Sequence, residues 1–389
     1  MSALRVVAET GALERAQRPI AIAAENADDV DRRNRFPLEA VDALKAQGLL
    51  GVAVPREFGG DGATLSDLSA IAKALGGACA STAMIFAMHQ ICMANLLDCA
   101  LESPWHRDLI KQVIGCPLLF ASATTEAGVG GDLRQSICAL DYSGDRISLI
   151  KDAPVISYGE YADAIFATAR RNADTAFSDQ VLVVLMRSQC QVERTSTWDA
   201  LGMRGTCSHG YRLKAEGRAE QVIPKPFADI AADSMVAISH LLWSSVWCGI
   251  ATAALSRAQN FVAAQVRNHS GHPPAGAVRL AGAFSRLHSV EASITNVREE
   301  WEAARSQPTF GVALSVNALK VSVSTDSLAV VDDAMMICGI QGYKNNGPYS
   351  LGRHLRDIHS ARLMIANDRI LATTGQMLLM QRRHRSRAD

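Results

Sequence analysis

The residues best suited to chemistry lie in two glycine-rich segments in the middle of the 389-residue chain. Thr124–Asp132 (TTEAGVGGD) combines hydroxyls with glycines directly after a β-prone run, and Trp198–Ser208 (WDALGMRGTCS) carries a guanidinium at Arg204. A guanidinium can bind a carboxylate, a backbone carbonyl or a phosphate. Gly202 and Gly205 allow tight backbone geometry beside it. Each segment is also compatible with a purely structural turn.

Composition and absent motifs exclude several classes of protein. The chain has 39 basic and 39 acidic residues, and this balance argues against a nucleic-acid partner. None of the nine cysteines forms a CxxC pair or a zinc-spaced cluster, which indicates reduced thiols in a cytoplasmic protein. The N-terminus lacks the apolar core of a signal peptide, and the most apolar stretch, residues 74–88, is too short to span a membrane. Rossmann and P-loop motifs are also absent.

The elements that must position these segments fall into three blocks. Residues 1–117 show helical apolar spacing, residues 118–226 contain short β-prone runs, and residues 227–389 contain four long Ala/Leu/Val-rich patterns. No helix-length segments separate the β-prone runs, which favours an antiparallel barrel or sandwich over a parallel sheet. We therefore expect a three-domain α+β chain with an N-terminal all-α domain, a middle antiparallel β domain and a C-terminal four-helix bundle.

Four motifs, spread over essentially the whole chain, resemble those of the acyl-CoA dehydrogenase superfamily of flavoproteins. Residues 54–82 resemble its P-x-x-[FY]-G-G-x-G loop and the helix that follows. Thr124–Asp132 is similar to T-E-P-G-A-G-S-D, and Val155–Asp163 to W-I-T-N-G-x-x-A-D. Trp198–Ser208 is very similar to W-D-x-L-G-M-R-G-T-x-S, and this is the most specific match.

The resemblance implies FAD bound between the middle and C-terminal domains and shared across a subunit interface, so that the chain is a homo-oligomer, a dimer or a tetramer. The implied reaction is the α,β-dehydrogenation of an acyl thioester, expected to be acyl-CoA. Electrons would leave to an acceptor protein or to O₂. The sequence gives neither the acyl chain length nor the choice between CoA and a carrier protein.

The resemblance also assigns cofactor-binding positions. Thr125 matches a threonine that bonds the pyrimidine side of the flavin, Ser157 keeps a hydroxyl where the family has a flavin-binding threonine, and Gly131 replaces a serine. Arg267 resembles the arginine that contacts the pyrophosphate of a neighbouring subunit's FAD, and Met336 replaces a glutamine near the adenosine. The full set is Ala123, Thr124, Thr125, Gly130, Gly131, Ile156, Ser157, Arg267, Met336, Gly339 and Ile340.

The family's reaction also needs a carboxylate base, which removes the α-proton of the thioester while the β-hydride moves to the flavin. Counted from the R-D pair that precedes it, the usual glutamate position falls on Ile365. The alternative position, on the first helix of the bundle, falls on Ser239. Asp368, nearly one helical turn after Ile365, is a candidate for a displaced base, and so is His240 if its pKa lies near neutral pH.

This departure leaves three function classes open. The first is a dehydrogenase with a displaced base. The second is a flavin-dependent monooxygenase, which has the same fold, activates O₂ on reduced flavin and often uses histidines; His89 lies in a segment that could face the flavin. The third is a flavin- or acyl-binding protein without catalysis. A dehydrogenase should bleach its flavin anaerobically when acyl-CoA is added. A monooxygenase should consume O₂ when reduced flavin and a substrate are supplied, and failure to take up flavin would exclude both enzymes.

Overall fold

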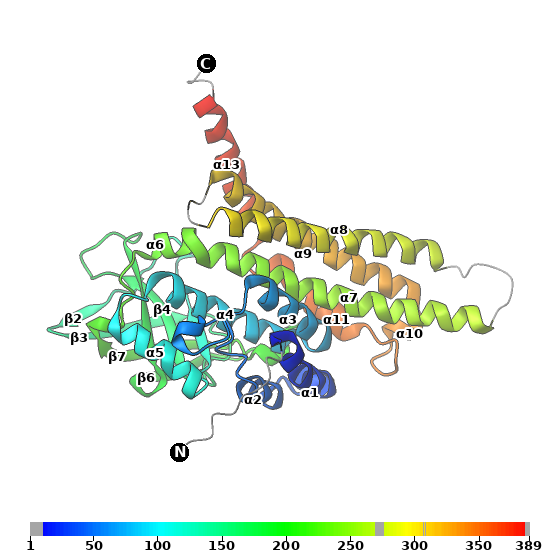
Figure 1. Cartoon of the computed structure of the whole chain (residues 1–389), viewed down its shortest axis with the longest axis horizontal. Coiled ribbons are helices and arrows are strands. Elements are labelled where there is room, and N and C mark those ends of the chain that lie inside the picture. The colour runs from blue at the N-terminus through cyan, green and yellow to red at the C-terminus, as the bar shows by residue number, and fades with distance from the viewer. Residues whose placement is uncertain (1–10, 269–275, 306, 308, 386–389) are drawn as a thin grey trace.

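The computed structural model describes residues 11–268, 276–305, 307 and 309–385. From residue 11 onward the N-terminal part contains five α-helices: α1 (Ala12–Arg33), α2 (Leu38–Ala46), α3 (Leu65–Ala78), α4 (Ala80–Cys99) and α5 (Pro104–Gly115). Thr64 and Asp67 form a capping box that fixes the start of α3, and Pro104 occupies the first turn of α5. α4 is buried along most of its length, packs against α3, α7 and β1, and lies at the centre of the molecule (Figure 1).

The middle part forms two small sheets. β1 (Phe120–Ala123), β4 (Ala164–Arg170) and β5 (Gln180–Met186) make the first, in the order β1-β4-β5. β2 (Asp141–Ser143), β3 (Arg146–Ala153), β7 (Gly210–Arg218) and β6 (Cys190–Ser196) make the second, in the order β2-β3-β7-β6. β3 and β7 alternate buried and exposed residues, as strands with one solvated face do.

One strand pair departs from the expected antiparallel arrangement. β1 and β4 pair in parallel, whereas every other pair in these sheets is antiparallel. The chain does not turn back directly after β1; it runs through the glycine-rich segment and the β2–β3 hairpin of the other sheet before β4. That detour lets β4 re-enter the first sheet in the direction of β1, and it leaves Thr124–Asp132 directly after β1, which is paired with the central strand β4.

Three long helices dominate the C-terminal part: α7 (Val236–Asn268), α8 (Ala277–Ala303) and α9 (Phe310–Cys338) run side by side along the molecule (Figure 1). A short α6 (Phe227–Ile230) and a π-helical turn lead into α7. The expected fourth helix is broken. It consists of α11 (Gly352–Ile358), α12 (Ser360–Leu363) and α13 (Asn367–Arg385), after a single-turn α10 (Ile340–Tyr343). The break lies at Ile365, whose φ of 49° is incompatible with a continuous helix.

The N- and C-terminal parts share one hydrophobic core. Their seam is tight: a Cβ atom at Gly249 of α7 would lie 2.0 Å from the carbonyl oxygen of Lys73 in α3. Two segments, Ala80–Cys99 and Phe227–Val266, are long and apolar enough to cross a membrane, but 83% of the most apolar window of each is buried in this core. The structure changes from helix to strand between α5 and β1 and back at α6, but the predicted boundaries at residues 117/118 and 226/227 stay a prediction.

Candidate active site

A cavity of about 640 Å³ lies where the middle part meets α4, α7, α9 and the broken segment α11–α13. Its wall brings together predicted residues from three distant parts of the sequence: Thr124, Thr125, Gly131, Ser157, Ser239, His240 and Ile365. The remainder of the wall is largely apolar and includes Met84, Met88 and Trp243. A mostly apolar cleft with a few convergent polar groups is typical of a small-molecule or cofactor site.

A chain of hydroxyl groups forms the polar side of the cavity. The Thr125 hydroxyl donates to the carbonyl oxygen of Val155 at 2.6 Å. The hydroxyl oxygens of Ser157 and Ser208 lie 2.8 Å apart, and those of Ser208 and Thr206 lie 2.7 Å apart. The Val155–Asp163 and Trp198–Ser208 motifs therefore meet at one surface. Such hydroxyls supply the donors and acceptors that orient a flavin ring, so the residues present fit that cofactor.

Gly131 explains one departure from the family motif. It has a φ of 76°, and a Cβ atom there would lie 3.2 Å from a terminal nitrogen of Arg369. The same guanidinium donates to the carbonyl oxygen of Gly130 at 2.5 Å. A serine at position 131 would crowd this contact. The glycine thus lets Arg369, from α13, reach over the loop into the cavity wall.

A buried ion pair anchors the loop that carries Thr124 and Thr125. Glu126 accepts hydrogen bonds from Lys151 Nζ at 3.1 Å and from the Ser136 hydroxyl at 2.6 Å, and both charged side chains are at most 5% exposed. Burial opposes ionisation of Glu126, but these bonds and the charge of Lys151 outweigh it and hold its pKa below the usual value. Lys151 also donates to the carbonyl oxygen of Thr168 in β4.

His240 presents a neutral imidazole to the cavity. Its Nδ1 lies 3.3 Å from the carbonyl oxygen of Val316, which can only accept, so Nδ1 carries the proton and Nε2 keeps its lone pair. Burial lowers the pKa of His240 to about 4. His359, at the end of α11, also lines the cavity and is half-buried. The sequence analysis missed His359 because it stands inside a helical pattern with no motif of its own.

His89 lies outside the cavity wall. Its Nε2 is 2.8 Å from the carbonyl oxygen of Leu50, and the backbone N–H of Phe120 donates to its Nδ1 at 3.1 Å. Both ring nitrogens are therefore occupied, and burial lowers the pKa of His89 to about 4. In this geometry His89 fastens α4 to β1, and it is a structural residue rather than one that faces the flavin pocket.

No described residue of the cavity wall supplies a free carboxylate. Asp132 is the one carboxylate in the wall; Arg134 binds it at 3.0 Å and holds its pKa below the usual range. Asp368 is exposed and does not line the cavity, because the left-handed turn at Ile365 removes the helical offset on which its candidacy rested. The Ser239 hydroxyl donates to the carbonyl oxygen of Met235, in the π-helical turn that leads into α7.

The remaining predicted cofactor residues lie behind the cavity or far from it. Ala123 and Ile156 are buried behind the wall. Gly339 has a φ of 53° between α9 and α10, where Met336 and Ile340 are 66% and 65% exposed. Arg267 is in α7, but its side chain lies outside the described residues. The contact of these last four residues with a neighbouring subunit's cofactor stays a prediction.

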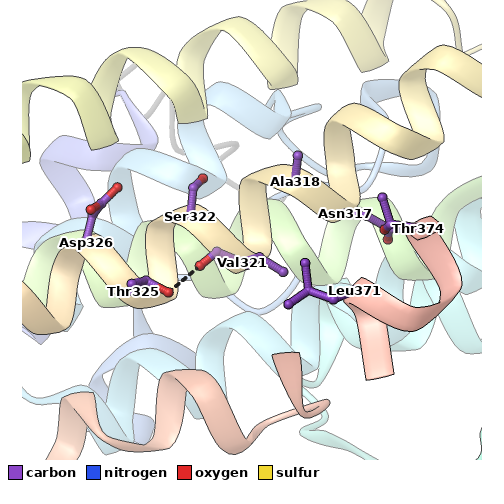
Figure 2. Close-up of a pocket in the computed structure, with 8 residues that line it drawn as sticks. All are labelled: Asn317, Ala318, Val321, Ser322, Thr325, Asp326, Leu371 and Thr374. Carbon is purple, nitrogen blue, oxygen red and sulfur yellow. Dashed lines mark hydrogen bonds between the residues drawn. The ribbon is translucent and has the colours of Figure 1, made fainter. Parts of the chain in front are cut away.

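A second hollow of about 400 Å³ lies between α9 and the start of α13 (Figure 2). The surface exposed in it is mainly apolar although five of its eight lining side chains are polar, and it shares Asn317 with the larger cavity. Its acidic residue, Asp326, pairs with Arg286 at 3.0 Å. The side chains around it are Asn317, Ala318, Val321, Ser322, Thr325, Asp326, Leu371 and Thr374. The convergent polar groups described above belong to the larger cavity, which is therefore the candidate active site.

Asp357 joins the Trp198–Ser208 segment to α11 and gives a prediction on pH. It accepts the backbone N–H of Met203 at 2.7 Å, and burial raises its pKa from 3.8 to about 6. The folded state therefore binds this proton more tightly than the unfolded state, so the contribution of Asp357 to stability falls as pH rises from 3.8 to about 6.

Asp357→Asn keeps the acceptor oxygen and removes the titration. We expect the variant to lose less stability than the wild type over this interval, measured by urea unfolding at several pH values; parallel curves would contradict this.

Comparison with known proteins agrees with the sequence motifs. Residues 16–103 match the model of the acyl-CoA dehydrogenase N-terminal domain, and residues 241–369 match that of the C-terminal domain. The chain is 29% identical to an L-evernosamine nitrososynthase of a Micromonospora strain, over 88% of this chain and 83% of that protein. It is 26% identical to a cyclohex-1-ene-1-carbonyl-CoA dehydrogenase of Syntrophus aciditrophicus, over 92% and 86%. FMN-bound TdsC of Paenibacillus sp. A11-2, a dibenzothiophene monooxygenase, superposes with a TM-score of 0.83 at 17% identity, over 95% and 97%.

Proposed function

This chain belongs to the acyl-CoA dehydrogenase superfamily, and within that family of flavoenzymes we propose that it is a flavin-dependent monooxygenase. The family confirms the prediction of a flavin cofactor, and FAD is consistent with it. The proposed reaction consumes O₂ and two electrons with two protons; one oxygen atom enters the substrate and the other leaves as water. Dehydrogenation of an acyl thioester is the competing function.

The observation that carries the proposal is the composition of the cavity wall. α,β-Dehydrogenation needs a base within hydrogen-bond reach of the substrate's α-proton. Ile365 and Ser239 occupy both positions where the family places that carboxylate, and the Asp132 carboxylate is already paired. Oxygenation on reduced flavin does not need this base. The nitrososynthase and monooxygenase among the related proteins support the same choice, although dehydrogenases are also among them.

The described side chains suggest how a substrate would bind. The hydroxyls of Thr125 and Ser157 would hold the flavin ring, and reduced flavin, when bound, would supply electrons to O₂. Met84, Met88 and Trp243 add an apolar surface to the same cavity wall. The neutral His240 can accept a hydrogen bond from a substrate N–H or O–H.

Basic side chains give the substrate a second expected feature. Arg134, Arg356, Arg369 and His359 line the same cavity, against the single carboxylate of Asp132. Arg356 pairs with Asp31, and Arg134 pairs with Asp132, so Arg369 has the fewest acidic contacts of the three guanidiniums. A substrate with an apolar body and an anionic or strongly polar group matches this wall.

An anaerobic titration separates the two functions. The flavin-loaded protein is mixed without O₂ with acyl-CoA thioesters of different chain lengths, and we expect no bleaching of the visible flavin absorbance. The protein with reduced flavin is then exposed to ¹⁸O₂ and a panel containing indole, dibenzothiophene and a nucleotide-linked amino sugar. We expect the heavy isotope in at least one product by mass spectrometry.

Two results would overturn the proposal. Anaerobic bleaching by any acyl-CoA would establish the dehydrogenase, and Asp368→Asn and His240→Gln would then test the displaced base. A purified chain that stays colourless and takes up neither FAD nor FMN would favour a binding protein without catalysis. If no acyl-CoA bleaches the flavin, and the reduced protein releases hydrogen peroxide without a labelled product, a wider substrate panel is needed.

A further inference from the structure

A buried lysine on α9 contacts the backbone of the cavity wall. Lys320 is fully buried, and its Nζ donates to the carbonyl oxygen of Ile365 and to the side-chain oxygen of Asn367, both at 2.7 Å. The ammonium also lies 5.7 Å from the centre of the Trp247 ring. Among the described residues, no carboxylate lies within ion-pair distance of it. A wholly buried cation is costly unless hydrogen bonds replace its water, and here the replacement comes from residues 365–367.

The segment that Lys320 contacts has an unfavourable backbone conformation. Ile365 is a β-branched residue with a φ of 49°, in the left-handed region that such residues rarely adopt. A conformation of this kind persists only where its surroundings impose it. Ser324, one turn after Lys320, adds a second contact, because the amide of Asn367 donates to its hydroxyl at 3.0 Å. One face of α9 therefore fixes both ends of the turn.

The same turn forms part of the active-site wall. Met364 and Ile365 line the cavity, as do Asn317 of α9 and His240 of α7. His240 itself is oriented by the carbonyl oxygen of Val316, one turn before Lys320 on α9. α9 therefore positions this side of the cavity wall, and Lys320 is the side chain of α9 that binds the strained backbone of Ile365.

We propose that Lys320 is a positioning residue that holds Met364 and Ile365 in the cavity wall and thereby sets how a substrate lies in the active site. Lys320 does not touch the cavity; it acts through the backbone of Ile365. The proposal about the turn stands on the structure alone, and only its consequence for catalysis rests on the proposed monooxygenase function. Burial also lowers the pKa of Lys320 to about 8, so the ammonium is retained at neutral pH with its donors in place.

Hydrogen–deuterium exchange tests the contact without substrate or cofactor. Lys320→Met keeps the length and apolar stem of the side chain and removes all donors. We expect exchange of the amides of residues 364–370 to rise at least about tenfold, with exchange in α9 unchanged. Lys111→Met, an exposed lysine on α5, is the matched control and should change neither region.

Two further variants keep the test decisive if Lys320→Met folds poorly. Asn367→Ala removes one of the two acceptors and should raise exchange of the same amides by a smaller factor. Ile365→Gly accepts a positive φ without strain, so it should suppress most of the effect of Lys320→Met in the double variant. Unchanged exchange at residues 364–370 in both Lys320→Met and Asn367→Ala would overturn the proposal.

A kinetic measurement then tests the consequence for substrate binding. With a substrate found by the ¹⁸O₂ experiment, we expect Lys320→Met to raise KM at least about tenfold and to divert O₂ to hydrogen peroxide, while flavin binding stays close to wild type. A general loss of stability would weaken substrate binding and flavin binding together. An exchange effect without any change in KM or peroxide release would confine Lys320 to a structural role and overturn the positioning claim. Failure of the monooxygenase proposal would leave the exchange result unaffected.

Discussion

Lys151→Met is expected to destabilise the fold by about 3–5 kcal/mol, because it leaves the Glu126 carboxylate buried without its cation. Lys151 is fully buried, and its ammonium also satisfies the carbonyl oxygen of Thr168, which would lose a donor. The methionine fills a similar volume, so the loss reports the electrostatic change rather than a cavity. Urea unfolding at neutral pH measures it. Because Glu126 immediately follows Thr124 and Thr125, flavin affinity should fall as well.

A second substitution and a pH series provide the control for this prediction. Lys151→Met with Glu126→Gln removes both charges, and it should recover most of the lost stability, since an unpaired buried charge costs more than a neutral amide. In the wild type the lowered pKa of Glu126 means that its contribution is present above 4.5 and is lost as pH falls. In Lys151→Met the charge of Lys151 no longer opposes burial, so the pKa of Glu126 is higher than in the wild type, and the deficit in stability should shrink as pH falls toward 4.5. A deficit independent of pH and equal in the double variant would contradict the ion-pair argument.

The motif loops show what the sequence could predict about the site. Thr124–Asp132 and Trp198–Ser208 carry family-specific patterns, and both reach the cavity wall. Their glycines are informative because the backbone there approaches other atoms closely, as at Gly202 beside the backbone of Arg356. Local patterns of this kind record contacts that only one residue type allows. The three-block organisation followed from periodicity for the same reason, since amphipathic spacing is a local property.

The features that sequence reasoning missed depend on contacts between distant segments. The parallel pairing of β1 with β4 is decided by the path of the chain through a second sheet. The left-handed turn at Ile365 opposes the preference of a β-branched residue, so nothing in the local sequence announces it. It is stabilised by Lys320, 45 positions earlier in the chain. Asp368 is excluded from the cavity wall because of this turn.

Gly202→Ala is expected to destabilise the protein by about 3 kcal/mol or more and to distort the active site. A Cβ atom at Gly202 would lie 2.2 Å from the carbonyl oxygen of Arg356, 2.4 Å from its carbonyl carbon and 2.7 Å from the backbone nitrogen of Asp357. These are backbone atoms, which cannot rotate away as a flexible side chain does. The added methyl must therefore push the Trp198–Ser208 segment from α11, and the hydrogen bond from Met203 to Asp357 lies at that seam.

The same substitution at an exposed position in a helix separates the effect of steric crowding from the effect of replacing glycine by alanine. Gly282 lies within α8 at a solvent-exposed position, and a Cβ atom there meets nothing within 4 Å. Gly282→Ala should stabilise the fold by about 0.5–1 kcal/mol, because alanine has the higher helix propensity. Urea unfolding of both variants therefore gives opposite signs if the close approach at Gly202 is real. Similar small effects from both would mean that the segment can move away from α11, and the cavity wall would then be less rigid than its hydrogen bonds imply. Since Gly202 and Arg356 both line the cavity, the loss of stability in Gly202→Ala should be accompanied by weaker flavin binding.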